Sequence, residues 1–69
     1  MNFLLEALEK KLEGEVAMAK ANIQVYIMNA SGIGEHPDVV EAVETQVAKI
    51  AEAEDKLGVI RTLDVLVLM

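Results

Sequence analysis

The sequence predicts an all-α protein: an antiparallel helical hairpin with a C-terminal apolar tail, assembling into a four-helix-bundle homodimer. Residues 2–29 contain no proline and repeat apolar side chains at helical spacing. A glycine-rich turn and Pro37 follow, and a second helical repeat begins there. The 69 residues form one domain and are 54% hydrophobic, but they include no cysteine. A chain this short buries too little surface alone, and no disulfide can compensate, so we expect self-association.

The first helix is expected over residues 2–29, which are rich in Leu, Ala, Glu and Lys, all good helix formers. Gly14 is its weak point, costing about 1 kcal/mol relative to alanine. The apolar residues expected to face the second helix recur every three or four positions: Leu5, Leu8, Leu12, Val16, Ala19, Ile23 and Ile27.

A turn over residues 30–36 and a second helix over residues 37–57 are expected next. Pro37 suits a first helical position, where its missing N–H has no intrahelical partner to lose. The apolar face of this helix is predicted to contain Val40, Val43, Val47, Ile50 and Leu57. The opposite side carries an acidic face formed by Asp38, Glu41, Glu44, Glu52 and Asp55.

The pattern changes after Gly58. On a straight helix, Arg61 would fall within the predicted apolar face and several aliphatic residues would fall on the acidic side. We therefore interpret Gly58 as a break or kink, followed by a short reoriented helix within the apolar tail, residues 58–69. A strand over residues 63–68 is the alternative. Such a tail is expected to cover the open end of a bundle.

The first helix also carries a second apolar stripe, roughly opposite the first. A helix that is apolar on most of its circumference must be covered on most of it, and the hairpin offers only one partner helix. A homodimer is the simplest closed solution. The alternative is a monomer in which the tail folds back over the stripe. The predicted oligomer interface contains Phe3, Ala7, Met18, Ala21, Val25, Met28, Leu63 and Leu66.

Glu54 falls on the predicted apolar side of the second helix, near Leu12 of the first. An unpaired buried carboxylate is costly, so we expect a basic partner, which Lys10, Lys11 or a basic residue of another subunit could supply. Lys11 is the candidate for a buried ion pair. An exposed edge and a functional carboxylate are the two alternatives.

No catalytic, cofactor-binding or metal-binding residue is expected, and the chain is not predicted to be an enzyme. His36 is the only imidazole, and it has no nucleophile or second ligand beside it. The glycines Gly32 and Gly34 follow a helix rather than a strand, so they favour a turn over a phosphate-binding loop. The carboxylate pairs at i,i+3 lie on the acidic face and indicate a solvated surface.

The formal net charge is −6, and most of the excess acid lies after residue 29. Direct nucleic-acid binding is unexpected because it requires a basic surface. Association with an anionic membrane is unexpected for the same reason. The opening residues lack the basic start of a signal peptide, and no apolar run is long enough to span a bilayer, so we expect a cytoplasmic protein.

Residues 32–44 and 50–57 resemble small uncharacterised helical proteins of tailed marine bacteriophages. The resemblance implies a helix, a glycine-rich turn ending near His-Pro, and a second acidic helix. The tail after Gly58 departs from these proteins, which end in a shorter polar-aromatic segment. The resemblance implies no catalytic residue and no reaction.

Three hypotheses for function follow. The first is a homo-oligomeric protein-interaction or structural module whose acidic face meets an unknown basic protein. The second is an acidic inhibitor that mimics nucleic acid and occupies a DNA-binding protein. The third is a metal- or carboxylate-dependent hydrolase, which a bound metal would reveal.

Overall fold

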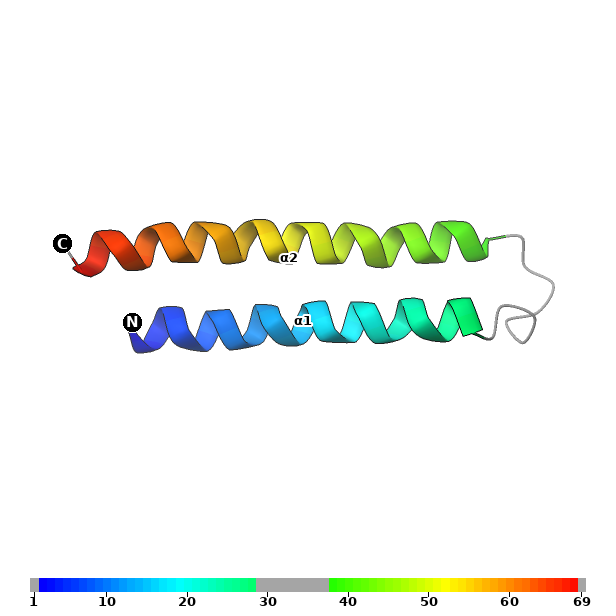
Figure 1. Ribbon diagram of the computed structural model, residues 1–69, viewed down its shortest axis with the longest axis horizontal. Helices are drawn as coiled ribbons and strands as arrows, with labels where there is room; N and C mark the ends of the chain where they lie inside the picture. Colours follow the sequence, from blue (N-terminus) through cyan, green and yellow to red (C-terminus); the bar gives the residue numbers. More distant parts are fainter. Residues whose placement is uncertain (1, 29–37, 69) are drawn as a thin grey trace.

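Two long helices lie side by side and run in opposite directions in the computed structural model of the protein (Figure 1). Helix α1 spans Phe3–Met28 and helix α2 spans Val39–Leu68. The structure describes residues 2–28 and 38–68, and every regular element in this part of the chain is a helix. The predicted all-α helical hairpin is therefore confirmed. The predicted features of residues 30–37, including His36 and the glycine turn, lie outside the described residues.

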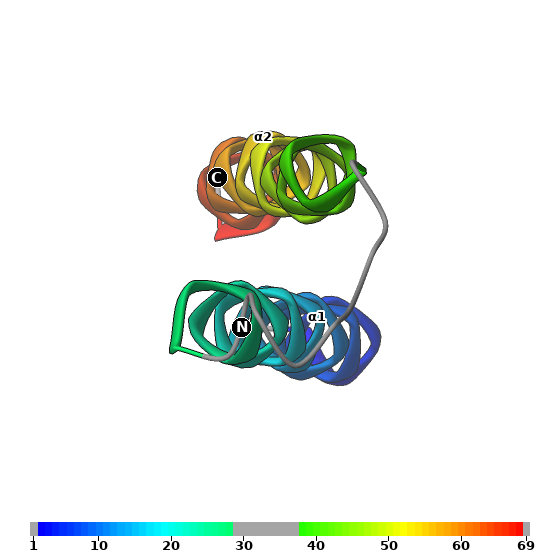
Figure 2. The same ribbon diagram turned by 90° about the vertical axis from the view of Figure 1, so that its right-hand side faces the viewer.

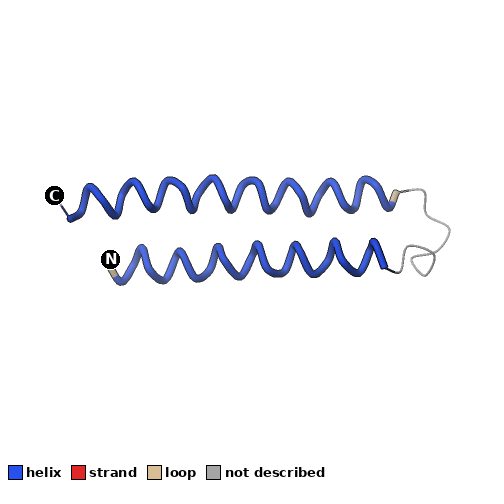
Figure 3. The backbone as a smooth tube through the Cα atoms, in the orientation of Figure 1, coloured by secondary structure: helices blue, strands red, loops and turns tan. Residues whose placement is uncertain are grey.

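The molecule is a rod with dimensions of 55 × 15 × 13 Å. The backbone tube shows two nearly parallel helix axes (Figure 3). Viewed end-on, each helix faces only one other helix (Figure 2). Most of the circumference of both helices is therefore open in a single copy.

The start of α1 is fixed by Asn2. Its side-chain Oδ1 accepts hydrogen bonds from the backbone N–H of Leu4 at 2.7 Å and of Leu5 at 3.4 Å. Its backbone carbonyl accepts the hydrogen bond from Glu6 N at 2.8 Å. Asn2 is thus an N-cap, which satisfies donors that the first helical turn leaves free.

The contact between the helices follows a seven-residue repeat. The side chains turned toward the partner helix recur at alternating steps of four and three residues on both helices. This spacing keeps one seam facing the other helix, as in coiled coils. The seam residues of α1 are Leu5, Glu9, Leu12, Val16, Ala19, Ile23 and Tyr26. Those of α2 are Val39, Val43, Gln46, Ile50, Ala53, Leu57, Ile60 and Asp64.

The core is a narrow strip along this seam. Leu12 is the most deeply buried large side chain, with 1% of its surface exposed. It belongs to one cluster with Val16, Ala53, Leu57 and Ile60, against which Leu5 and Ile50 also pack. Apolar contact through this cluster therefore supplies the attraction between the helices. Near the open end of the hairpin, Oδ1 of Asp64 is buried without a hydrogen-bond partner among the described residues.

Helix α2 passes through Gly58 without interruption, so the predicted break and the alternative strand are both wrong. The hydroxyl of Thr62 donates to the carbonyl of Gly58 at 3.3 Å, one helical turn back. The seam also continues across this point, because Leu57 and Ile60 are both buried. Gly58 itself is exposed, so it lies off the seam and does not need to bend the chain.

Several residues that were predicted to face the partner helix are exposed instead. Leu8 is 41% exposed and Ile27 is 70% exposed, although both were expected to face α2. Val40 and Val47 are also exposed, whereas Gln46 is buried. The prediction assigned apolar residues to the contact face at any helical spacing. The actual seam follows a strict alternation of four and three residues, and some of its positions are polar.

Candidate interaction surface

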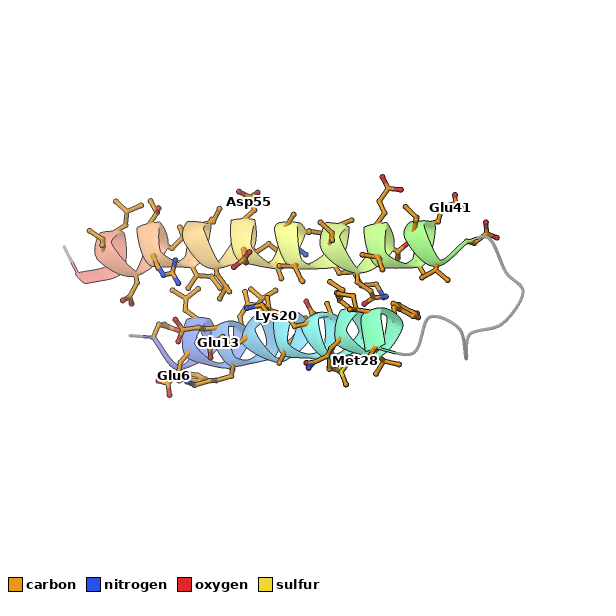
Figure 4. All side chains as sticks on the ribbon, turned by 45° about the vertical axis from the view of Figure 1, so that its right-hand side comes forward. Glu6, Glu13, Lys20, Met28, Glu41 and Asp55 are labelled. Atoms are coloured by element: carbon orange, nitrogen blue, oxygen red, sulfur yellow. The ribbon has the colours of Figure 1, made fainter. Side chains whose placement is uncertain are left out.

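One side of α1, turned away from α2, is largely apolar and is interrupted by Lys10 between Ala7 and Gly14. We call it the outer α1 face, and its seven residues are all exposed. The exposed fraction is 66% at Met18 and 76% at both Phe3 and Met28. Met28 is directed away from α2 in Figure 4. The outer α1 face consists of Phe3, Ala7, Gly14, Met18, Ala21, Val25 and Met28.

The opposite surface of the rod is acidic. The predicted acidic residues of α2 are all exposed, and we call this set the acidic α2 face: Asp38, Glu41, Glu44, Glu52 and Asp55. Figure 4 shows Glu41 and Asp55 directed away from α1. Glu52 pairs with Lys56 of the same helix, with Nζ and Oε1 3.0 Å apart. The two long sides of the hairpin thus differ sharply in chemistry, one apolar and one anionic.

Leu63 and Leu66, the remaining predicted interface residues, lie near the end of α2. They are 41% and 59% exposed. They are on a different helix from the outer α1 face, so the eight predicted interface residues do not form one strip. Leu4, Val59 and Val65 are also exposed near the chain ends.

The predicted buried ion pair between Glu54 and Lys11 is wrong for this chain. Glu54 is exposed, because it is next to the seam residue Ala53 rather than on the seam. Lys11 instead binds Glu15 one turn along α1, with Nζ 2.6 Å from Oε1. Leu12 belongs instead to the apolar cluster that contains Leu57 of α2.

A shallow groove of about 360 Å³ runs along one side of the helix contact. Asn22 and Gln46 both line this groove, and the side-chain Nδ2 of Asn22 donates to Oε1 of Gln46 at 3.2 Å. Gln46 is 7% exposed, so this hydrogen bond satisfies a buried amide oxygen. Charged residues of both signs line the walls, among them Glu15, Lys49 and Lys56. This polar pair was not predicted from the sequence, because its two residues are 24 positions apart.

Replacing Asn22 with alanine is expected to lower the free energy of unfolding by about 1 kcal/mol, because Gln46 Oε1 loses its donor. Combining Asn22→Ala with Gln46→Leu is expected to restore stability to the wild-type level or above, since the buried amide is then gone. Urea unfolding at fixed protein concentration measures both effects. Gln24→Ala, which removes an exposed amide from the same helix, is the control and should change little. Equal losses for Asn22→Ala and Gln24→Ala would contradict a role for the pair.

Two titrating groups of the groove have shifted pKa values. The pKa of the Glu15 carboxyl is lowered, chiefly by the hydrogen bond from Lys11. Partial desolvation opposes this, and the charges of Lys11 and Lys56 lower it further. The pKa of Lys56 is raised, chiefly by its hydrogen bond to Glu52. Because these groups are exposed, the pairs contribute little to stability and mainly fix the charge of the groove walls.

Among residues 2–28 and 38–68, no cluster of three or more His, Cys, Asp or Glu side chains is arranged to hold a metal ion. Neither helix, as far as it is described, is apolar over a length sufficient to cross a bilayer. Comparison with protein-family models, with curated proteins and with solved structures found no match for this chain. The resemblance to marine bacteriophage proteins stays a prediction.

Proposed function

We propose that this chain is a non-enzymatic, self-associating interaction module of the cytoplasm. Two hairpins join through their apolar surfaces into a four-helix homodimer. The acidic α2 face of each copy then remains available to a basic protein partner. The resemblance to bacteriophage proteins is compatible with a small structural or adaptor protein of this kind.

The exposed surface of a single copy carries this proposal. A compact protein of 7.5 kDa exposes about 4200 Å² by the scaling of surface with mass. This chain exposes 5215 Å². The excess of about 1000 Å² is close to the roughly 800 Å² that each partner buries in a standard protein interface. A contact of standard size with a second copy would remove a surplus of this amount.

Measuring the mass of the protein in solution tests the proposal directly. Sedimentation equilibrium over a wide range of concentrations is expected to give twice the chain mass of 7.5 kDa, with dissociation only on strong dilution. Unfolding should become easier as the protein is diluted, because association stabilises the folded state. A chain that stays monomeric throughout, and melts at one temperature irrespective of its concentration, would overturn the proposal.

The exposure of all five residues of the acidic α2 face favours one alternative, an acidic mimic of nucleic acid. Such an inhibitor would compete with DNA for a basic DNA-binding protein. Its binding should weaken steeply as salt is raised, because exposed charges are screened. Competition titrations with duplex DNA distinguish the two, since DNA displaces a mimic from the site that both would occupy and does not displace an interaction module bound elsewhere on its partner.

A further inference from the structure

We propose that the second copy docks on the outer α1 face, so that the two α1 helices pack antiparallel across a twofold axis at Gly14. This inference rests on the proposed self-association and specifies its geometry. The excess surface of about 1000 Å² per copy sets the amount to be covered. The arrangement of the outer α1 face determines where that contact is made.

The chemistry of the two long sides excludes the other simple dimer. A contact between two acidic α2 faces would bring ten exposed carboxylates together, five from each copy, and like charges repel across an interface. The outer α1 face contains no acidic residue, and four of its members are large apolar side chains that are 56–76% exposed. Joining the α1 helices also leaves both acidic faces on the outside, as far apart as the assembly allows.

The order of five residues along the outer α1 face is self-complementary, namely Phe3, Ala7, Gly14, Ala21 and Val25. Ala7, Gly14 and Ala21 are seven residues apart, and two helical turns take about 7.2 residues, so the three lie in line. In an antiparallel pair centred on Gly14, Ala7 of one copy faces Ala21 of the other. Phe3 likewise faces Val25, so a large side chain meets a medium one on each side of the small residues.

Gly14 is suited to the axis because nothing crowds it. A Cβ atom placed there meets no atom within 4 Å in a single copy. Glycine weakens the middle of a helix, and close approach of a second backbone is one condition that favours it. Lys10 lies opposite Met18 in this pairing, where its aliphatic stem can cover the methionine while the ammonium stays in water.

Single cysteines test the geometry cleanly, because the natural chain contains none. Gly14→Cys alone is expected to form a disulfide-linked dimer under mild oxidation, since only a residue at the axis meets itself. Ala7→Cys mixed with Ala21→Cys should cross-link as a heterodimer, and each alone should not. Asp55→Cys, on the acidic α2 face, is the control and should remain monomeric on denaturing gels.

A bulky residue at the axis gives an independent readout. Gly14→Leu is expected to weaken dimerisation by tenfold or more, because the α1 helices can no longer approach. Its helicity should not fall, since leucine forms helix better than glycine, so loss of the dimer cannot be attributed to unfolding.

The outcomes separate the geometry from the self-association itself. A wild-type monomer in solution defeats both. A wild-type dimer that Gly14→Leu leaves intact, or that cross-links through Leu63→Cys and not through Gly14→Cys, overturns the antiparallel α1 contact but retains the proposed function.

Discussion

Replacing Leu12 with alanine is expected to lower the free energy of unfolding by about 2–5 kcal/mol, the range for a large aliphatic side chain removed from a packed core. Leu12 is only 1% exposed and belongs to the cluster that joins the helices through Leu57 and Ile60. The substitution leaves a cavity in the seam. The seam contains few other buried apolar residues, so few neighbouring side chains can move in to fill it. Urea unfolding followed by far-ultraviolet circular dichroism measures the loss, and the variant is expected to be largely unfolded at room temperature.

Leu4→Ala is the matched control for this experiment. It removes the same side chain from the same helix, but Leu4 is 66% exposed and off the seam. Its effect should be within about 0.5 kcal/mol of zero, as for most surface substitutions. If the two variants lost stability equally, the seam through Leu12 would not be the contact that holds the hairpin together.

The sequence was sufficient for the fold class because helix formation is local. The α1 residues are strong helix formers with a clear apolar repeat, and α1 spans Phe3–Met28, close to the expected 2–29. Which residues face the partner was harder to predict. Ile27 is as apolar as Ile23, and only the alternating four-three step, which includes Glu9 and Tyr26, distinguishes them. Hydrophobicity alone cannot make this distinction in a chain with more apolar residues than one seam can hold.

For the candidate surface, the side of a helix on which most residues lie could be predicted, but the contacts between the two helices could not. Six residues of the outer α1 face were expected on a stripe roughly opposite the first, and they are exposed in a single copy, whereas Gly14 was not among them. Glu54 was misplaced because its side chain is next to the seam rather than on it, the same error of helix facing as at Ile27. The hydrogen bond between Asn22 and Gln46 was missed because it depends on the register between the two helices, which no local pattern records. Interactions between distant parts of the chain were thus the ones that sequence reasoning failed to find.

Replacing Gly58 with proline is expected to lower the free energy of unfolding by at least about 3 kcal/mol, the cost of proline inside a helix. Proline removes the backbone N–H that a continuous α2 uses at this position, and its ring clashes with the carbonyl one turn back. The preceding residue, Leu57, is also forced out of helical geometry, although its side chain is 8% exposed and part of the core. Thermal unfolding and helicity at a fixed protein concentration measure the effect.

Gly58→Ala should act in the opposite direction at the same position. A Cβ atom at Gly58 meets nothing within 4 Å, and alanine favours the helix over glycine by about 1 kcal/mol. The melting temperature is expected to rise by roughly 4–8 °C for a domain of this size. A hinge would reverse the order, because proline is tolerated where a helix ends and alanine gains nothing there. Opposite signs for the two variants therefore distinguish a continuous α2 from two helices joined at Gly58, a question that apolar periodicity alone answered wrongly.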